Sequence, residues 1–250
     1  MHHRQLTRLS VLLGSLMISS LAQAGIANGD FANGLTGWQT FGDVAAPSSA
    51  LVLTTATLGA DDHPFADGHH NVSGQDAGAI GIPGGLEDFV GVALGSLDPD
   101  PINHTSVLWE GSAAQQSFAV QAGDTLHFDW NLLSADRDFA DQAFVVINAT
   151  FGSGLQVLAL ALANASLATN VVSGSTDLLQ TGVNQFSHTF TGSGQVTMSW
   201  VVADLDDSAK TSLLTVDNVA LTSAVPEPTM ALLALLGLGG LGVIRVNRRA

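Results

Sequence analysis

The feature that most constrains the fold is a series of short apolar runs separated by turn-forming residues, at a spacing of about 8 to 12 residues. The clearest run is Thr125 to Asn131, in which Leu126, Phe128 and Trp130 alternate with polar side chains. A period of two is the pattern of a β-strand with one buried face. The segment Gln121 to Asp124 (QAGD) precedes this run and has the composition of a tight turn. The sequence therefore predicts a hairpin here, within an all-β fold.

Three further segments have strand patterns. Gln195 to Ala203 alternates large and small residues, Ala143 to Phe151 (AFVVINATF) is apolar on both faces, and Leu213 to Leu221 (LLTVDNVAL) is interrupted by a polar pair. The second of these predicts a central, buried strand. Only Leu155 to Leu167 has some helical periodicity. Many short antiparallel strands predict a single domain over residues 25–223, with an antiparallel two-sheet sandwich fold.

Acidic residues dominate the charge of this domain. The whole chain has 22 Asp and Glu against seven Lys and Arg, but only Arg137 and Lys210 lie between residues 25 and 225. Glu227 is the one acidic residue outside this region, so 21 carboxylates face two basic side chains, a net charge of −19. Such a surface repels phosphate, which excludes nucleic acid as a partner. Cysteine is absent, which excludes disulfides, thiol catalysis and thiolate metal sites.

Residues 1–24 have the three parts of a secretory signal peptide. A basic start is followed by an apolar run from Leu9 to Leu21 and by an A-x-A cleavage site that ends at Ala24. The apolar run is shorter than the ~20 residues that a membrane-spanning helix needs, so a spanning helix is the less favoured alternative. We therefore expect an exported chain whose mature form begins at Gly25.

The end of the chain, residues 224–250, has a three-part pattern. It comprises a proline-rich motif, an uncharged stretch and a basic end: Val225, Pro226, Glu227 and Pro228; residues 229–244; and Arg245, Arg248 and Arg249. This pattern resembles the PEP-CTERM sorting signal of Gram-negative bacteria. Tails of that family are substrates of an exosortase, a membrane-embedded, transpeptidase-like enzyme that acts near the Pro-Glu-Pro motif. The resemblance implies delivery to the cell envelope or the extracellular matrix.

The physical properties of residues 229–244 agree with a single transmembrane helix. A helix of this length rises about 24 Å, less than the ~30 Å of the hydrocarbon core, and its four glycines weaken it further. The terminal arginines favour the cytoplasmic side, which leaves the acidic domain outside. We expect a transient membrane anchor that is removed by processing. A permanent anchor without processing is the alternative.

Short motifs at the two ends of the domain resemble those of galactose-binding-like jelly rolls, which include many carbohydrate-binding modules. They are Asn28-Gly29-Asp30-Phe31 with Gly37-Trp38, and Asp217-Asn218-Val219-Ala220-Leu221. The resemblance implies a jelly roll whose first and last strands lie side by side, with Asp30 near Asp217. It also implies a structural calcium held by the Asp30 carbonyl and the Asp217 carboxylate, although Ala32 stands where the family often has a carboxylate. The alternative is that Asp217 simply belongs to a bulge or turn.

Trp109 is the candidate for a carbohydrate contact. Jelly rolls that bind sugars commonly use exposed aromatic rings, and this chain has four tryptophans and no tyrosine. Trp130 and Trp200 lie on apolar strand faces, and Trp38 matches a buried position of the resembled family. A carbohydrate-binding module that uses Trp109 is therefore an alternative function for this domain.

Asp-rich segments connect several of the apolar runs. Residues 61–71 (DDHPFADGHHN) contain Asp and His side chains of the kind that bind zinc, but their spacing matches no defined site. A solvated turn is therefore the favoured interpretation. The connections 134–142 and 203–210 are also acidic, and we expect them to meet solvent or an ion.

No catalytic motif is present. The sequence lacks a nucleophile elbow, an H-E-x-x-H pair, a phosphate loop and a dinucleotide fingerprint. Glycosidases need two opposed carboxylates, and Glu87 and Glu110 are the only glutamates of the domain. We predict a non-catalytic binding or structural protein associated with exopolysaccharide. A secreted hydrolase that acts on glycans is the alternative.

Overall fold

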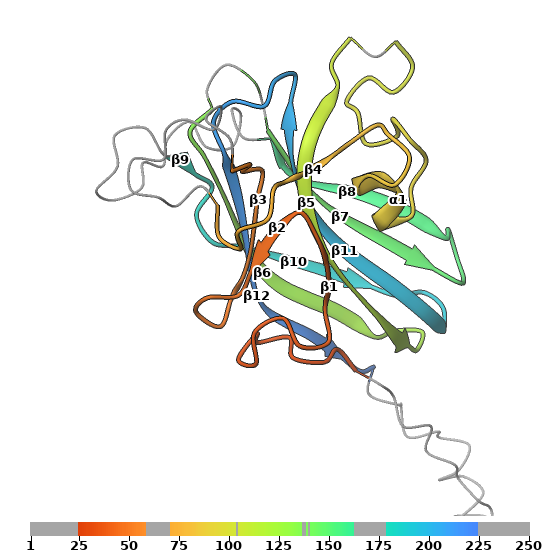
Figure 1. Ribbon diagram of the computed structural model, residues 1–250. Coiled ribbons are helices and arrows are strands. Elements are labelled where there is room, and N and C mark those ends of the chain that lie inside the picture. Colours follow the sequence, from red (N-terminus) through yellow and green to blue (C-terminus); the bar gives the residue numbers. More distant parts are fainter. Residues whose placement is uncertain are drawn as a thin grey trace, which may run out of the picture.

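The computed structural model describes residues 25–58, 71–103, 105–136, 139, 141–162 and 179–224. They form two antiparallel sheets packed face to face, which confirms the predicted all-β sandwich (Figure 1). The signal peptide, residues 61–70 and the tail from residue 225 onward lie outside the described residues. Among the described residues, no helix is long and apolar enough to cross a membrane. The predicted helix over 229–244 falls outside this part of the chain.

The first sheet, called sheet A, has the strand order β1-β5-β11-β7-β8, and β4 pairs with β5. Its strands are β1 (Gln39–Phe41), β4 (Gly78–Ala79), β5 (Leu108–Val120), β7 (Gln142–Ala149), β8 (Leu155–Leu162) and β11 (Gly194–Leu205). The two longest strands, β5 and β11, pair along almost their whole length. The apolar segment predicted as a central strand is β7, which lies between β11 and β8.

The second sheet, called sheet B, has the order β10-β6-β12-β3-β2, and β9 pairs with β6. Its strands are β2 (Asp43–Ala45), β3 (Leu51–Thr54), β6 (Thr125–Ser134), β9 (Leu179–Gln180), β10 (Asn184–Thr189) and β12 (Ser212–Thr222). The predicted turn at Gln121–Asp124 is present, but it joins β5 of sheet A to β6 of sheet B. The two strands do not pair with each other. Both strands point their apolar side chains into the space between the sheets, so the connection is an arch rather than a hairpin.

The space between the sheets holds the main core, with aromatic rings at its centre. The rings of Trp38 and Trp200 lie 5.0 Å apart, and the Trp200 ring meets Phe128 edge-on at 5.3 Å. Burial of each large apolar side chain contributes roughly 1.5–3 kcal/mol. The predicted inward positions of Trp38, Trp130 and Trp200 are therefore confirmed.

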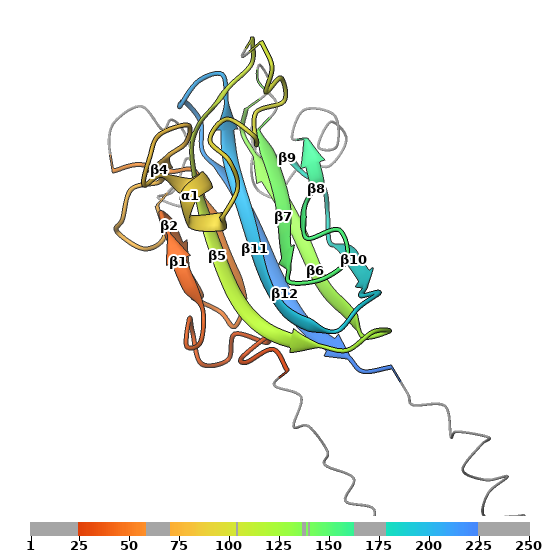
Figure 2. The ribbon, with the colours of Figure 1, turned by 90° about the vertical axis from the view of Figure 1, so that its right-hand side faces the viewer.

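Part of the outer face of sheet A is covered by a second, smaller core. The chain between β4 and β5 includes the helix α1 (Leu86–Val90) and packs Leu86, Val90 and Leu97 against that face (Figure 2). Phe144 and Val146 of β7 belong to this second core, whereas Val145 and Ile147 belong to the main core. This double coverage explains why β7 is apolar on both faces.

Two regions differ from the expectations. The stretch with some helical periodicity forms β8 up to residue 162, because the exposed edge of β7 binds its backbone. The opening motif forms turns rather than a first strand, and its contact with the last strand is a hydrogen bond from the Val219 N–H to the Gly29 carbonyl (2.9 Å). A Cβ on Gly29 would lie 2.0 Å from the Val219 carbonyl oxygen, so this close approach requires glycine.

Candidate functional site

The outer face of sheet B is polar and uncovered along β6, β10 and β12. Because side chains alternate along each strand, the inward Phe128 and Phe186 leave their neighbours pointing outward. We call these outward side chains the polar face, which comprises His127, Asp129 and Asn131 of β6, Gln185 and Ser187 of β10, and Thr215, Asp217 and Asn218 of β12. The polar face contains acceptors and donors but no lysine or arginine.

A bulge in β12 shapes the centre of the polar face. The pairing of β12 with β6 shifts register between Asp217 and Ala220, and Asn218 adopts a left-handed backbone conformation (φ +54°). This conformation leaves the Asn218 side chain exposed, where its amide donates to Asp129 Oδ2 at 2.8 Å. Asparagine is one of the few residues that tolerate such a conformation. The bulge predicted as the alternative role of Asp217 and Asn218 is therefore present.

Two hollows adjoin this central pair and share Asp129 and Asn218. One, of about 250 Å³, also includes His127, Gln185 and Ser187. The other, of about 300 Å³, includes Asn131, Thr215 and Asp217, with the exposed Val183 and Ala50 as apolar walls. The two hollows therefore adjoin each other across the strands, with polar side chains and the apolar Val183 and Ala50 along them.

Asp30 and Asp217 each take part in local turn hydrogen bonds. Asp30 Oδ1 accepts from the Ala32 N–H at 3.2 Å, and Asp217 Oδ1 accepts from the Asn218 N–H at 2.6 Å. Within the described residues, no group of three or more His, Asp or Glu side chains is arranged to hold a metal ion. Calcium takes six to eight oxygen ligands, and the Asp30 carbonyl and the Asp217 carboxylate would supply only a minority of them. A calcium site built on these two groups would therefore bind weakly.

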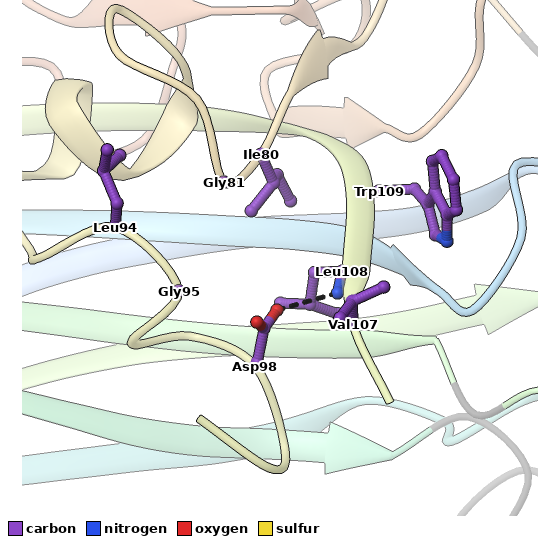
Figure 3. A pocket seen from close by; sticks show the side chains of 8 residues that line it. All are labelled: Ile80, Gly81, Leu94, Gly95, Asp98, Val107, Leu108 and Trp109. Atoms are coloured by element: carbon purple, nitrogen blue, oxygen red, sulfur yellow. Dashed lines mark hydrogen bonds between the residues drawn. The ribbon is translucent and has the colours of Figure 1, made fainter. Parts of the chain in front are cut away.

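Trp109 is 55% exposed, as expected for a side chain outside the core. It borders a pocket of about 360 Å³ between β5 and the chain that covers sheet A, lined by Ile80, Leu94 and Asp98 among others. In Figure 3 the indole points away from these three side chains, on the other side of the β5 ribbon. Asp98 accepts a hydrogen bond from the Leu108 N–H at 2.9 Å. Trp109 is thus one of the residues that line the pocket, and its exposed ring lies on the other side of β5 from Ile80, Leu94 and Asp98.

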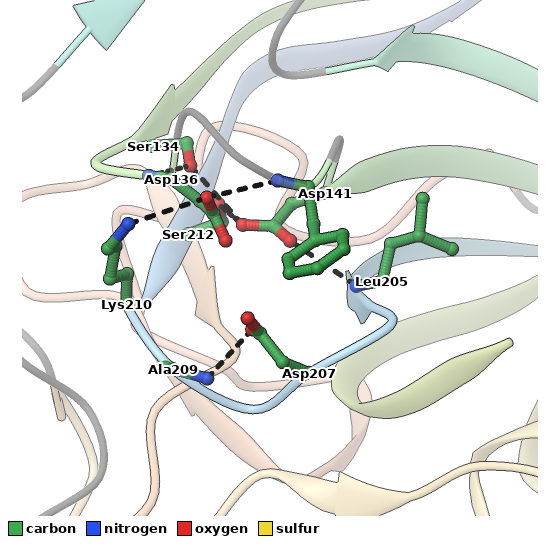
Figure 4. Close-up of polar contacts among 9 residues, drawn as sticks. Ser134, Asp136, Asp141, Leu205, Asp207, Ala209, Lys210 and Ser212 are labelled. Carbon is green, nitrogen blue, oxygen red and sulfur yellow. Dashed lines mark hydrogen bonds and ion pairs between the residues drawn. The ribbon is translucent and has the colours of Figure 1, made fainter. Parts of the chain in front are cut away.

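The acidic connections 134–142 and 203–210 come together at one end of the sandwich (Figure 4). The sequence predicts that these connections meet solvent or an ion, but Asp136, Asp141 and Asp204 are buried. The Asp141 carboxylate accepts from the hydroxyls of Ser134 (3.2 Å) and Ser212 (2.5 Å) in sheet B and from the Leu205 N–H (3.3 Å) in sheet A. This carboxyl group therefore links the two sheets.

Burial raises the pKa of Asp141 to about 7, and the nearby charge of Asp136 acts in the same direction, against the hydrogen bond from Ser212. Asp136 is itself balanced by Lys210, whose ammonium lies 3.7 Å from Asp136 Oδ1. A buried carboxyl group with this environment holds a proton near neutral pH. The contacts of Asp141 are explained by a structural role, in which its carboxyl group joins the two sheets.

Comparisons with known proteins identify the end of the chain. Residues 224–249 match the PEP-CTERM protein-sorting motif. This chain carries a PEP-CTERM sorting motif. The motif residues from Val225 onward, including Arg245, Arg248 and Arg249, lie outside the described residues, so their predicted roles rest on the sequence. The motif indicates a secreted protein that is processed by an exosortase.

Several solved structures are similar to the chain in fold. TmCBM61, solved in complex with β-1,4-galactotriose, is 10% identical, with 81% of this chain and 100% of that chain covered and a TM-score of 0.36. The K3 cleaved adhesin domain of Lys-gingipain from Porphyromonas gingivalis W83 is 14% identical, with 80% and 100% covered and a TM-score of 0.38. A CBM4 structure is 11% identical, with 80% and 99% covered and a TM-score of 0.37. No curated protein matches the chain.

Sequence reasoning singled out Trp109 and missed the polar face. The signal was nevertheless present, because His127, Asp129 and Asn131 are the polar half of the clearest alternation in the sequence. What the sequence could not give is the partner strands. Gln185 and Asp217 lie opposite Asp129 in the register, from positions 56 and 88 residues later in the chain.

Proposed function

We propose that this exported protein resides in the cell envelope or extracellular matrix of a Gram-negative bacterium and binds a neutral polysaccharide along the polar face, without catalysis. The observation that carries the proposal is the pair of hollows joined across Asp129 and Asn218. Sugar hydroxyls both donate and accept hydrogen bonds, and the polar face offers both kinds of partner. The sorting motif supports an extracellular site of action.

The charge of the domain favours a neutral polymer over an anionic one. The polar face includes two carboxylates and no basic side chain, so an anionic polysaccharide would be repelled. Open, shallow hollows on a sheet also suit an internal segment of a long chain better than a small, enclosed ligand. The polymer expected to bind is the extracellular polysaccharide of the producing cell.

The test is retention of the mature protein on that polysaccharide, measured by affinity electrophoresis. Asp129→Ala and Asn131→Ala remove hydrogen-bonding groups from the two hollows, and each should weaken retention by about tenfold, which corresponds to about 1.4 kcal/mol. Ser117→Ala is the matched control, because Ser117 is an exposed polar residue of sheet A that bonds to Thr197. Native retention of both polar-face variants would refute the proposal.

A second candidate site is the surface around Trp109, favoured by the exposed indole beside a pocket. Stacking of a sugar ring on an exposed aromatic ring would give a carbohydrate-binding module of the predicted kind. Trp109→Ala in the same electrophoresis distinguishes the two sites. Loss of retention with Trp109→Ala, together with native retention of Asp129→Ala, would favour this second site.

The hydrolase alternative requires a pair of opposed, accessible carboxylates. Glu87 is buried, and its carboxylate accepts from the Gly95 N–H at 2.7 Å and from the Leu97 N–H at 3.2 Å, so it holds the chain that covers sheet A. We therefore propose a non-catalytic role. Release of reducing ends from the host polysaccharide by the purified protein, abolished by one carboxylate substitution, would contradict it.

A further inference from the structure

The sorting motif begins where the folded domain ends. Strand β12 ends at Thr222, and the motif starts at residue 224, so only Ser223 lies between them. In Figure 2 the end of β12 lies at the same end of the sandwich as the turn from β5 to β6. We call this the tail-side end, which comprises the turn Gln121–Asp124, the turn 191–194 and the last residues of β12. The chain thus enters the motif without a spacer.

Asp124 binds the first residue of the motif. Its side chain is only 1% exposed, and its Oδ1 accepts a hydrogen bond from the Ala224 N–H at 3.0 Å. Its Oδ2 accepts from the Gln121 N–H at 2.7 Å, which fixes the carboxylate within the turn. A Cβ on Gly123 would lie 2.9 Å from the Ala224 Cβ, so residue 224 is also packed against this turn. We call the Asp124–Ala224 contact the clamp.

The clamp restrains the segment that the processing enzyme must bind. It lies two residues before Pro226, and it connects positions that are 100 residues apart, so it forms only in the folded domain. An enzyme that cuts a polypeptide needs extended, accessible backbone on both sides of the cut. When opening is fast, cleavage follows the population of the open form. A hydrogen bond that holds the start of the motif against the domain lowers the population of the accessible form and therefore slows processing.

We propose that Asp124 acts as a brake on tail processing: it holds the start of the sorting motif on the folded domain, and the exosortase gains full access only when the clamp opens. The proposal goes beyond the polysaccharide function and does not depend on it. In this proposal the chain is the substrate of the exosortase. Asp124 positions the start of the sorting motif and is not a catalytic residue.

The distribution of charge agrees with an approach of the tail-side end to a membrane-embedded enzyme. Among the described residues, the opposite end holds several carboxylates of the connections. Asp98 and Asp206 accept from the Leu108 and Val107 N–H groups at the start of β5, and Asp136, Asp141 and Asp207 lie in the connections beside the end of β11 (Figure 4). The tail-side end has the buried Asp124, and Asp30 lies in the opening turns beside Gly29, whose carbonyl accepts from the Val219 N–H. Repulsion from anionic headgroups is therefore smallest where the motif leaves the domain.

The test follows loss of the tail from the full-length chain in a bacterium that contains its exosortase, by pulse-chase and mass spectrometry. Asp124→Ala should accelerate processing by about tenfold, which corresponds to about 1.4 kcal/mol. Asp124→Asn keeps one acceptor oxygen in place of the two that bind Ala224 and Gln121, so its rate should lie between those of the native chain and Asp124→Ala. The matched control is Asp206→Ala, because Asp206 accepts from the Val107 N–H (2.9 Å), 99 positions away, at the opposite end.

A spacer separates the clamp from a general loss of stability. Six Gly and Ser residues inserted after Ala224 leave the clamp intact but move the processed segment away from the domain. This variant should also be processed about tenfold faster than the native chain, and Asp124→Ala should then add nothing. A general loss of stability would instead make Asp124→Ala act equally with and without the spacer.

Four results would overturn the proposal. They are an unchanged or slower rate for Asp124→Ala, an equal acceleration by Asp206→Ala, an unchanged rate with the spacer, and retention of the complete tail by the native chain. The spacer variant keeps the test decisive if Asp124→Ala does not fold, because the insertion lies outside the packed domain.

Discussion

The outer faces of the two sheets differ in how far they are buried, although the inner faces of both sheets share one core. Sheet A is covered by the chain around α1 over the part of its outer face where residues such as Phe144 and Val201 are buried in a second apolar cluster, whereas Ser117, farther along β5, is exposed. Sheet B keeps its outer face open along β6, β10 and β12 and presents polar side chains there. The comparison teaches that one face of the sandwich is used for stability, which leaves the other free for recognition.

The covered face should be far more sensitive to truncation than the open one. Phe144→Ala removes a buried ring from the second cluster and should lower the free energy of unfolding by about 3–5 kcal/mol. The matched change on the open face, Gln185→Ala, should stay within about 0.5 kcal/mol. Urea unfolding of the mature domain measures both. Similar losses for the two variants would show that the faces do not differ in this way.

The link between the sheets at Asp141 should make stability depend on pH. Since its folded pKa of about 7 lies above the unfolded value of about 3.9, the folded state binds this proton more tightly. The stabilising contribution is complete below about pH 4 and is lost as the pH rises through about 7. Between pH 5 and pH 8 the native domain should lose about 1–3 kcal/mol more than Asp141→Asn, whose amide does not titrate.

Urea unfolding at a series of pH values measures this difference, and only the difference between the two proteins reports on Asp141. The domain is strongly acidic, so its self-repulsion changes with pH in both proteins. Parallel curves for the native domain and Asp141→Asn would show that Asp141 does not hold the proton.

The smallest expected effect concerns calcium at the start of the bulge in β12. If the Asp30 carbonyl and the Asp217 carboxylate bind calcium with a Kd of about 1 mM, 5 mM calcium stabilises the fold by about 1 kcal/mol. The Tm of the mature domain should then rise by about 2–4 °C, and Asp217→Asn should abolish the rise. Magnesium at the same concentration is the control. A Tm that is the same with calcium and with chelator would contradict the prediction.

The sequence predicted much of the fold because strand alternation is a local property. The alternations at Thr125–Asn131 and Gln195–Ala203 placed Phe128, Trp130 and Trp200 on buried faces, and the structure has them there. It did not predict that Gln121–Asp124 would be an arch between sheets, since a turn sequence does not state which strands pair. It also gave no sign that β8 would be extended, because an apolar run fits a helix or a strand equally well.

The candidate site divides in the same way. The exposure of Trp109 followed from elimination among four tryptophans, whereas the contact between Asn218 and Asp129 depends on a register shift between strands 89 positions apart. The burial of Asp141 was also unexpected, because an Asp-rich connection is normally solvated. Its partners, Ser212 at the start of β12 and Leu205 at the end of β11, are more than 60 positions away in the chain.

By itself, the sequence determined that the chain is an all-β domain with a sorting motif at its end, because strand period and motif order are written in neighbouring residues. Only the tertiary structure decided which outer face is covered, which polar side chains meet on the open face, and that Asp124 reaches the first residue of the motif. These outcomes depend on strand pairing and packing across 50 to 100 positions. Local propensities do not specify such contacts, because the contacts form only when the two sheets close on their common core.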